Sequence, residues 1–381
     1  MIGTKRQRKR GVWEISVEHG RDALGKRRRR SRTVHGTKAD ADRTQREMVA
    51  EAERVRTQDP SDTETRVLIA DWVRDWLKSP AMSEKAITTL ERYADNAERH
   101  VLPYAGAIPL RDLSLRHIRE MERGMLEGRL SGRPVGNRSL QIAHRILAGA
   151  CEMAVEMEHL DRNLMSSVRA PRCRSDEVIP PEAKVVQQLL KLARREAHRL
   201  FAYIYLLTYT GLRRGEGMAL TWENVNLDLG NIFVAATVVK TKKGLMSQRP
   251  KTRRAVRTID LDPGTIEVLK EHRARQIELG ISGGRNGLVF PDGLGEWMKP
   301  TTMDRDLKQL ASRVGAVGLT FHCFRHFHAT MLLQAGQSVV VVSQRLGHAD
   351  PSITLRIYGH VLTGWQKGAA QAFAEAMEDA A

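Results

Sequence analysis

The sequence predicts a multidomain α+β protein: a small β-sheet with a helix, a four-helix domain, and a mixed, mainly helical domain with a small antiparallel sheet. Its 381 residues exceed what one hydrophobic core usually accommodates. Apolar residues alternate with period two near the N-terminus, then recur at helical spacing over about 63–165, and later show both patterns. A Pro- and Arg-rich linker follows at about 170–181. We therefore expect domains over residues 1–60, 62–170 and 176–381.

The charge of the chain predicts a polyanionic partner. Lys and Arg number 62 against 45 Asp and Glu, which gives a net charge of +17. Residues 1–60 alone contain 17 basic and 9 acidic side chains, a net of +8. Such an imbalance is typical of proteins that bind nucleic acid. A merely solubilising surface charge is the alternative.

Cysteine content and hydropathy exclude several other classes of protein. The three cysteines, Cys151, Cys173 and Cys323, are far apart and odd in number, so they predict neither a disulfide framework nor a zinc site. No apolar run approaches 18 residues, and the basic N-terminus lacks the apolar core of a secretory signal. We expect a cytoplasmic protein with no membrane contact and no metal.

In the first domain we expect a short sheet followed by a helix. Residues 12–17 alternate with period two, which is typical of a strand, and the arginine-rich stretch 27–34 is predicted to return as another strand. Thr37 or Asp40 can cap a helix that continues to about Arg56. The alternative is a disordered basic tail, against which the apolar side chains of the first strand argue.

The second domain is predicted to contain four helices. Apolar residues of 67–77 have helical spacing. Ser83 is predicted to cap a second helix that ends near 103–106, Ser114 opens a third, and Asn137 opens a fourth.

The third domain is predicted to be mixed. Two helices are expected over 182–196 and 200–209. Residues 232–239 form one β-rich run and 254–259 another, with a basic hairpin over 240–252 between them. No phosphate-binding glycine loop is found, so no nucleotide cofactor is implied.

The segment 321–360 contains four chemically capable side chains in a fixed order. His322 and Arg325 are three residues apart, so they share one face of a helix. His348 follows a glycine that resembles a helix C-cap, and Tyr358 lies about two helical turns beyond the next turn. Two imidazoles, a guanidinium and a phenol suit the attack of a tyrosine on a phosphodiester.

This order resembles the C-terminal signature of the tyrosine recombinase (phage integrase) family: H-x-x-R, then L-G-H, then a tyrosine ten residues after that histidine. The family also has an upstream T-G-x-R-x-x-E motif, and residues 210–216 read T-G-L-R-R-G-E. A single H-x-x-R arises by chance, whereas the ordered set over about 150 residues is specific.

The resemblance implies a site that binds the phosphate. Arg213 and Arg325 would stabilise the charge that develops on its oxygens, since arginine presents a planar, permanently charged fork. Arg214 is the alternative to Arg213. His348 would donate to a phosphate oxygen, and Glu216 would orient the first arginine.

The resemblance also implies the groups that move protons. Tyr358 would be the nucleophile, and His322 would accept its proton or bind the phosphate. The leaving 5′ oxygen needs a general acid, which the family supplies from a lysine on a β-hairpin. Lys251 fits best, and the alternatives are Lys240, Lys242 and Lys243.

As a member of this family, the chain would be a site-specific DNA recombinase of a phage or mobile element, with an arm-type DNA-binding module, a core-binding domain and a catalytic domain. It would act on double-stranded core and arm sites as a homotetramer, without cofactors, and with scope for an accessory DNA-bending protein or excisionase. The arginines expected to contact arm DNA are Arg27, Arg28, Arg29, Arg30 and Arg32.

Two other functions remain open at this point. A type IB topoisomerase-like enzyme uses the same chemistry but rejoins the same strand. A catalytically silent DNA-binding regulator would share the fold, although every catalytic position is occupied here.

Overall fold

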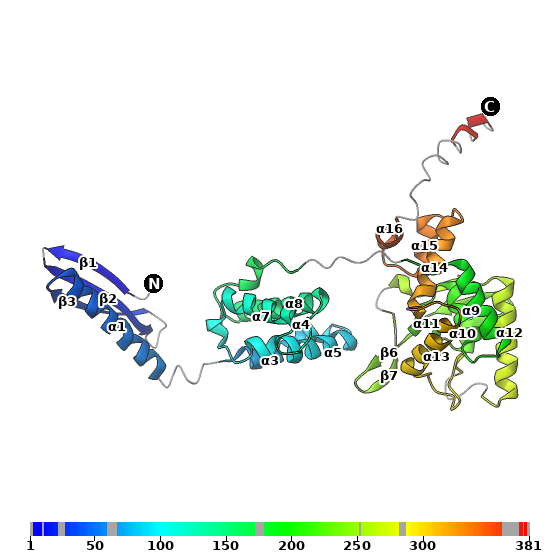
Figure 1. Cartoon of the computed structure of the whole chain (residues 1–381), viewed down its shortest axis with the longest axis horizontal. Helices are drawn as coiled ribbons and strands as arrows, with labels where there is room; N and C mark the ends of the chain where they lie inside the picture. Colours follow the sequence, from blue (N-terminus) through cyan, green and yellow to red (C-terminus); the bar gives the residue numbers. More distant parts are fainter. Residues whose placement is uncertain are drawn as a thin grey trace. The chain divides into compact units, whose positions relative to one another are not determined.

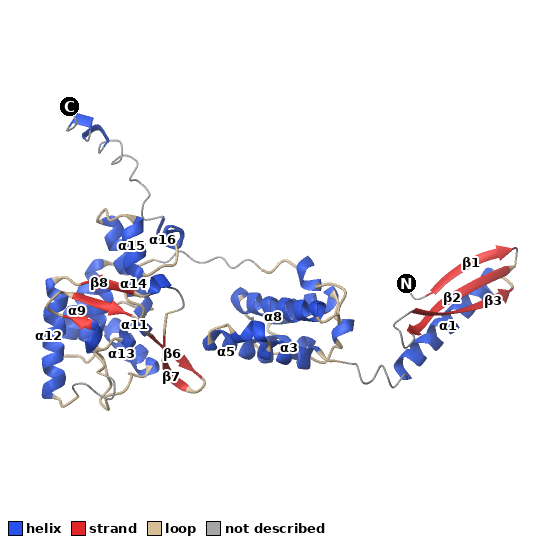
Figure 2. Ribbon diagram, turned by 180° about the vertical axis from the view of Figure 1, so that it is seen from behind, coloured by secondary structure: helices blue, strands red, loops and turns tan. Residues whose placement is uncertain are grey.

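The computed structural model describes residues 3–9, 11–21, 27–58, 67–171, 179–250, 253–281, 287–359, 373–375 and 377–378. The chain divides into two compact units, Met1–Cys173 and Arg174–Ala381. Its fold is mainly helical, with small antiparallel sheets, which confirms the predicted mixed α+β class (Figures 1 and 2).

The first part of unit 1 is a three-stranded antiparallel sheet with one helix packed on it. Its elements are β1 (Gly3–Lys9), β2 (Val12–Arg21), β3 (Arg27–His35) and α1 (Lys38–Gln58). The strands lie in the order β1-β2-β3, and Ile15 and Val17 of β2 are buried together with Met48 of α1. The sequence did not predict β1, because this strand contains no apolar residue and forms through its pairing with β2.

The second part of unit 1 is helical and has a hydrophobic core of its own. Its helices are α3 (Ile69–Lys78), α4 (Pro80–Ser83), α5 (Ile87–Asn96), α6 (Leu102–Ala105), α7 (Leu115–Glu127) and α8 (Asn137–Glu156). The four longest correspond to the four predicted helices. Trp72 on α3 is buried, and its indole nitrogen donates to the backbone oxygen of Ala150 on α8 at 2.7 Å.

One predicted helix start was wrong. Ser83 is the last residue of α4, where its hydroxyl donates to the backbone oxygen of Pro80 at 2.6 Å, and α5 begins four residues later at Ile87. The error arises because Pro80 starts a separate short helix, which uses the serine that otherwise resembles an N-cap.

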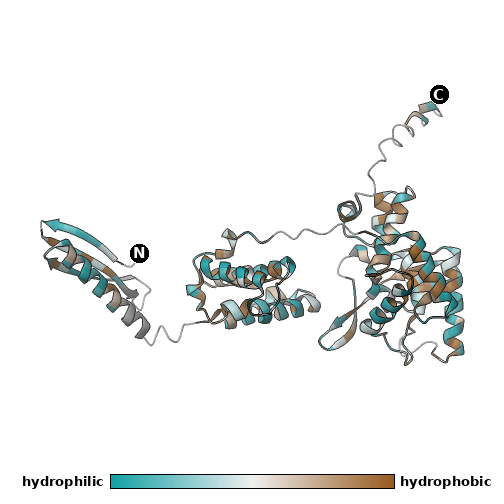
Figure 3. Cartoon of the chain, in the orientation of Figure 1, coloured by the Kyte–Doolittle hydropathy of each residue, from teal (hydrophilic) through white to brown (hydrophobic). Residues whose placement is uncertain are grey.

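The helices of unit 2 surround one apolar helix. They are α9 (Ala183–Arg195), α10 (Phe201–Thr210), α11 (Arg214–Ala219), α12 (Pro263–Glu278), α13 (Pro300–Arg313), α14 (Phe321–Gln334), α15 (Val339–Leu346) and α16 (Pro351–Tyr358). Helix α10 is mostly buried and contacts α9, α11, α12 and α14. Figure 3 shows hydrophobic and hydrophilic residues alternating along the helices, as expected where one face packs on a core.

The β-structure of unit 2 differs from the prediction in where its strands begin and end. The second β-rich run, 254–259, begins within a 3₁₀ turn over 253–255, and its strand starts at Arg257. Strands β4 (Val225–Asn226), β5 (Asn231–Val234) and β8 (Arg257–Asp260) form one antiparallel sheet, and β6 (Thr237–Thr241) pairs with β7 (Gly244–Gln248) in another. The run 232–239, expected as one β-rich run, contains two strands. It divides at residues 235–236, because β5 pairs with β8 whereas β6 turns away to contact α11 and form the basic hairpin.

Among the described helices, none combines the length and the apolar character that a bilayer crossing requires.

Candidate active site

The motif residues come from four segments of unit 2 that lie far apart in the sequence. Helix α14 packs against α10 and α15, and α15 packs against α16. The turn between α10 and α11 carries Arg213, α14 carries His322 and Arg325, the turn after α15 carries His348, and α16 ends at Tyr358. The fold therefore brings these residues into one region of unit 2.

Arg213 is held by a buried carboxylate. It is the N-cap residue of α11, and its guanidinium donates to Glu216 Oε1 at 2.8 Å while its backbone N–H donates to Oε2 at 2.9 Å. Buried Arg257 of β8 donates to the same carboxylate at 3.0 Å. Burial alone would raise the pKa of Glu216, but the charges and hydrogen bonds of Arg257 and Arg213 outweigh it and lower this pKa. Glu216 thus stays ionised and orients Arg213. Arg257, which the sequence did not single out, holds the carboxylate of Glu216 in place through its hydrogen bond.

Arg214, the alternative to Arg213, lies in a different environment. Its guanidinium pairs with Asp304 of α13 at 2.8 and 2.9 Å, and its backbone oxygen accepts from the hydroxyl of Tyr203 at 2.7 Å. The two neighbouring arginines therefore have separate carboxylate partners.

Arg325 is buried, with 2% of its surface exposed. Its guanidinium donates to the backbone oxygen of Gly211 at 2.9 Å and to that of Leu346 at 2.8 Å, so it joins the two motif turns. Burial, followed by the nearby charge of Arg213, lowers the pKa of Arg325 to about 9, so the group is still positively charged at neutral pH.

The two motif glycines are required by the backbone and by close packing. Gly211 has φ +68°, and a Cβ there would lie 2.7 Å from Leu346 Cδ2. Gly347 also has φ +68°, and a Cβ would lie 2.9 Å from a guanidinium nitrogen of Arg257. Only glycine adopts this conformation readily and leaves that space. These glycines therefore fix the turns that carry Arg213 and His348.

His348 is buried and held in one orientation by the first turn of α16. Its Nδ1 lies 2.8 Å from the hydroxyl of Thr354. Burial and the charges of Arg325 and Arg213 lower the pKa of His348 to about 4, so the ring is neutral at pH 7. Because Nδ1 is occupied by the threonine, Nε2 is the nitrogen left to meet a ligand.

Tyr358 lies against a histidine that the sequence analysis did not select. Its hydroxyl is 2.8 Å from Nδ1 of His326, and only 1% of Tyr358 is exposed. Burial raises the pKa of Tyr358 to about 12, although Arg325 and Arg213 act in the opposite direction. The available signal was the four-residue spacing of His322 and His326, which puts both rings on one face of α14.

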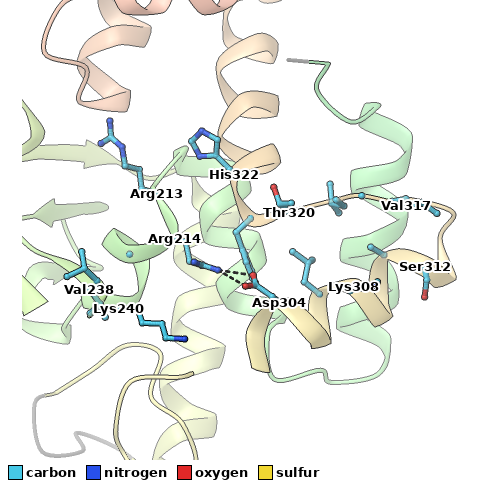
Figure 4. Close-up of a pocket in the computed structure, with 18 of the residues that line it drawn as sticks. Arg213, Arg214, Val238, Lys240, Asp304, Lys308, Ser312, Val317, Thr320 and His322 are labelled. Atoms are coloured by element: carbon cyan, nitrogen blue, oxygen red, sulfur yellow. Dashed lines mark hydrogen bonds and ion pairs between the residues drawn. The ribbon is translucent and has the colours of Figure 1, made fainter. Parts of the chain in front are cut away.

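His322 lies at the edge of a pocket of about 990 Å³. Its ring is exposed and packs edge-on against His326, with 4.4 Å between ring centroids. Figure 4 shows the side chains of Arg213 and His322 at the same end of this pocket. Lys240, Arg214 and Lys308 also line the pocket, so its walls carry several positive charges.

The proposed general acid, Lys251, lies outside the described residues. Of the alternatives, Lys240 is on β6 and lines the pocket with Arg213, while Lys242 and Lys243 are exposed at the turn between β6 and β7. The choice among these lysines therefore stays a prediction.

The side chains of Arg27, Arg28 and Arg29 are also outside the description, although their backbone belongs to β3. Arg30 and Arg32 are exposed, but they pair with Val17 and Ile15, which are buried against α1, and Arg30 forms an ion pair with Glu51 of that helix at 3.0 Å. Directly paired residues share a face of a sheet. These two arginines therefore belong to the helix-covered face.

The open face of this sheet presents different basic residues. Arg6 of β1 pairs with Glu14, and Arg8 forms an ion pair with the same glutamate at 2.6 Å. Both arginines are exposed. The sequence analysis missed them because it did not predict β1.

The chain is similar to a family of known proteins. Residues 182–364 match the family model described as "Phage integrase family". A "Tyrosine recombinase XerC-like" protein of Caldanaerobacter subterraneus is 26% identical over 378 residues, covering 92% of each chain. The "ICEBs1 integrase" of Bacillus subtilis is 24% identical over 374 residues, covering 94% of this chain and 95% of that protein. The integrase of Mycobacterium phage D29 is 22% identical over 294 residues, covering 76% and 74%.

Solved structures are similar in fold. The Tn1549 transposon integrase in complex with transposon right end DNA has a TM-score of 0.68 at 17% identity, covering 81% of this chain and all of that one (100%). A lambda integrase tetramer bound to a Holliday junction has a TM-score of 0.59 at 18% identity, covering 91% and 96%.

Proposed function

Because this chain belongs to the phage integrase family of tyrosine recombinases, we propose that it is the site-specific DNA recombinase of a phage or mobile element, and that Tyr358 forms a 3′-phosphotyrosine link with DNA. The observation that carries the proposal is that Arg213 and Arg325 lie close enough to both Tyr358 and His348 to lower the pKa of each side chain through their charge.

The phosphate is bound by fixed positive charge and hydrogen-bond donors. Arg213 and Arg325 face the non-bridging oxygens, and His348 donates from Nε2. Glu216 and the backbone oxygens of Gly211 and Leu346 hold the two guanidinium groups before DNA arrives. Donors that are already oriented stabilise the transition state without a cost of reorganisation during the reaction.

The chemical step exchanges one phosphoester for another. The Tyr358 oxygen attacks phosphorus, the bond to the 5′ oxygen breaks, and the hairpin lysine, proposed as Lys251, protonates that oxygen. A 5′-OH from a second duplex later reverses the step. The number of phosphoester bonds is unchanged, so the exchange needs no nucleotide hydrolysis.

The three parts of the chain are proposed to have separate tasks. Residues 1–60 bind arm DNA, 62–170 bind core DNA, and 176–381 bind and cut it. Support comes from the separate hydrophobic cores of the first two parts and from the basic pocket of the third. Two rounds of strand exchange require four protomers assembled on DNA, as in the tetrameric lambda integrase complex.

Covalent trapping on a nicked duplex tests the proposal. A nick close to the cleavage site lets the short 5′-OH strand diffuse away, so the 3′-phosphotyrosine accumulates and is seen on a denaturing gel. Tyr358→Phe should give no adduct while retaining DNA binding. An adduct formed by the phenylalanine variant would place the nucleophile elsewhere.

The same approach separates the alternative functions. Strand joining between paired sites would distinguish recombination from a topoisomerase-like reaction. If the unmodified protein forms no adduct, a silent DNA-binding regulator is favoured.

A further inference from the structure

We propose that His326, rather than His322, is the group that receives the phenol proton of Tyr358 when the tyrosine attacks DNA. This inference rests on the proposed function, because it assigns a further catalytic residue to the same reaction.

His326 contacts the oxygen that would react. Both histidines are described by the structure, and His326 is the one whose ring nitrogen lies within hydrogen-bond range of the reacting oxygen, at 2.8 Å. Distances of this size are what a direct proton transfer requires. His326 is buried, with 8% exposed, on a helix that packs against α15, and its ring also contacts the ring of Tyr358 on α16.

His326 is also in the protonation state that can accept a proton. Burial, and then the charges of His322 and Arg325 on the same helix, lower the pKa of His326 to about 4. His326 is therefore neutral at pH 7. In the tautomer with its proton on Nε2, Nδ1 has a free electron pair that accepts from the phenol hydroxyl. The charged groups close to this pair are Arg325 and Arg213, which lower the pKa of Tyr358, whereas His348 is uncharged at that pH.

The proton does not leave the phenol in the resting protein. Burial keeps the pKa of Tyr358 at about 12, far above that of its partner. As the oxygen bonds to phosphorus it loses electron density, and its proton becomes strongly acidic. The proton then moves from Oη to Nδ1 while the P–O5′ bond breaks and the leaving oxygen takes a proton from the hairpin lysine. The incoming phosphate also adds a negative charge that favours the imidazolium. In the reverse step His326 returns the proton to Oη.

This assignment leaves His322 a different task. Its ring is exposed and opens onto the pocket that Arg213 also lines, which suits a donor to the phosphate rather than a base for the tyrosine (Figure 4). The edge-on contact of the two rings means that His322 also keeps His326 in place.

The test is single-turnover cleavage of a nicked core duplex by the full chain across a pH series. Two variants are compared, His326→Asn and His322→Asn. Asparagine at 326 can still accept a hydrogen bond near the position of Nδ1, but it cannot carry a proton. Each reaction is repeated with a substrate whose 5′ bridging oxygen is sulfur, because a thiolate leaves without a proton.

His326→Asn is expected to lower the cleavage rate at neutral pH by about 10²-fold or more, the usual contribution of a general base. The rate should rise as pH increases, because hydroxide then replaces the missing base, and sulfur should not restore it. His322→Asn should lack this pH-dependent recovery. A rate for His326→Asn within about twofold of the unmodified protein at neutral pH would overturn the proposal, as would recovery with sulfur or the same pH profile in His322→Asn.

The design separates this inference from the proposed function. Adduct formation by the unmodified protein tests the recombinase chemistry, whatever His326 does. DNA affinity and thermal unfolding of each variant are measured alongside. If a variant has the DNA affinity and melting temperature of the unmodified protein, its rate loss is assigned to the chemical step. A rate loss that only follows a loss of folded protein counts against a general base at this position.

Discussion

At the scale of single residues, the two motif arginines, Arg213 and Arg325, differ in how they are held. Arg213 is partly exposed and depends on the carboxylate of Glu216, whereas Arg325 is buried and depends on two backbone oxygens. The sequence predicted both positions from motif spacing. It did not reveal Arg257 or His326. Their contacts with Glu216 and Tyr358 join segments that only the fold brings close, and the four-residue spacing of His322 and His326 was the one signal for the histidine.

We expect Arg213→Lys to reduce the single-turnover cleavage rate by about 10²-fold or more. The planar guanidinium can donate to the carboxylate of Glu216 and to the phosphate at the same time, which the ammonium group of lysine, a point charge, cannot do. Arg214→Lys is the matched control, since it makes the same change one residue away at a side chain paired with Asp304. Comparable losses in both variants would contradict the assignment of Arg213.

Lys251→Ala is expected to lose cleavage of ordinary DNA and to regain most of it on the substrate with a 5′ bridging sulfur, since that leaving group needs no general acid. The measurement is the ratio of the two single-turnover rates. If the ratio equals that of the unmodified protein, the acid belongs to Lys240, Lys242 or Lys243, which are tested in the same way.

At the scale of elements, helix ends explain most of the agreement between sequence and structure. Gly347 marks the end of α15 as predicted, Gly211 ends α10 in the same way, and Asp350 caps α16 by accepting from the backbone N–H of Ser352. Strands were harder to predict. β1 has no hydrophobic pattern, and the continuous apolar run that contains β5 and β6 gives no sign of the point where the chain changes sheets.

Gly347→Ala should destabilise the protein and also slow cleavage, because the new methyl group would press on Arg257 beneath the turn that carries His348. Gly336→Ala is the matched control: it too has a positive φ, of +83°, but open space around the added atom. We expect about 1–2 kcal/mol of unfolding free energy for the control, the cost of a left-handed residue with a side chain. Gly347→Ala should cost more, and cleavage by the control should be unchanged. Denaturant unfolding and single-turnover rates check this, and equal effects would disprove the contact argument.

At the scale of the whole molecule, charge is concentrated where the proposed arm module lies, with a net of +8 in residues 1–60. We expect a protein lacking these residues to form covalent complexes on short core DNA but to fail at integration on full-length sites. Arm binding should weaken steeply as salt rises, since each phosphate contact releases counterions. Full recombination by the truncated protein would exclude a two-site model.

The open face of the sheet allows a sharper version in the full chain. Arg6→Ala with Arg8→Ala should weaken binding to arm DNA, because a β-ribbon reads the groove through one face. Arg43→Ala with Arg46→Ala removes the same charge from exposed positions of α1 and serves as the control. Equal weakening by both pairs in a mobility-shift titration would mean that the module attracts DNA by charge alone.

The double attachment of Arg325 affects how inactive protein should be prepared for structural work on DNA complexes. Its guanidinium bonds to Gly211 and Leu346, so a variant at this position loses cleavage and also frees two turns that shape the site. The structure of such a variant with DNA would show a site whose two turns have moved, and not the site as it is when it binds its substrate. Tyr358→Phe removes one oxygen at the end of α16 and leaves those turns tied, and it is therefore the better choice for trapping a substrate complex.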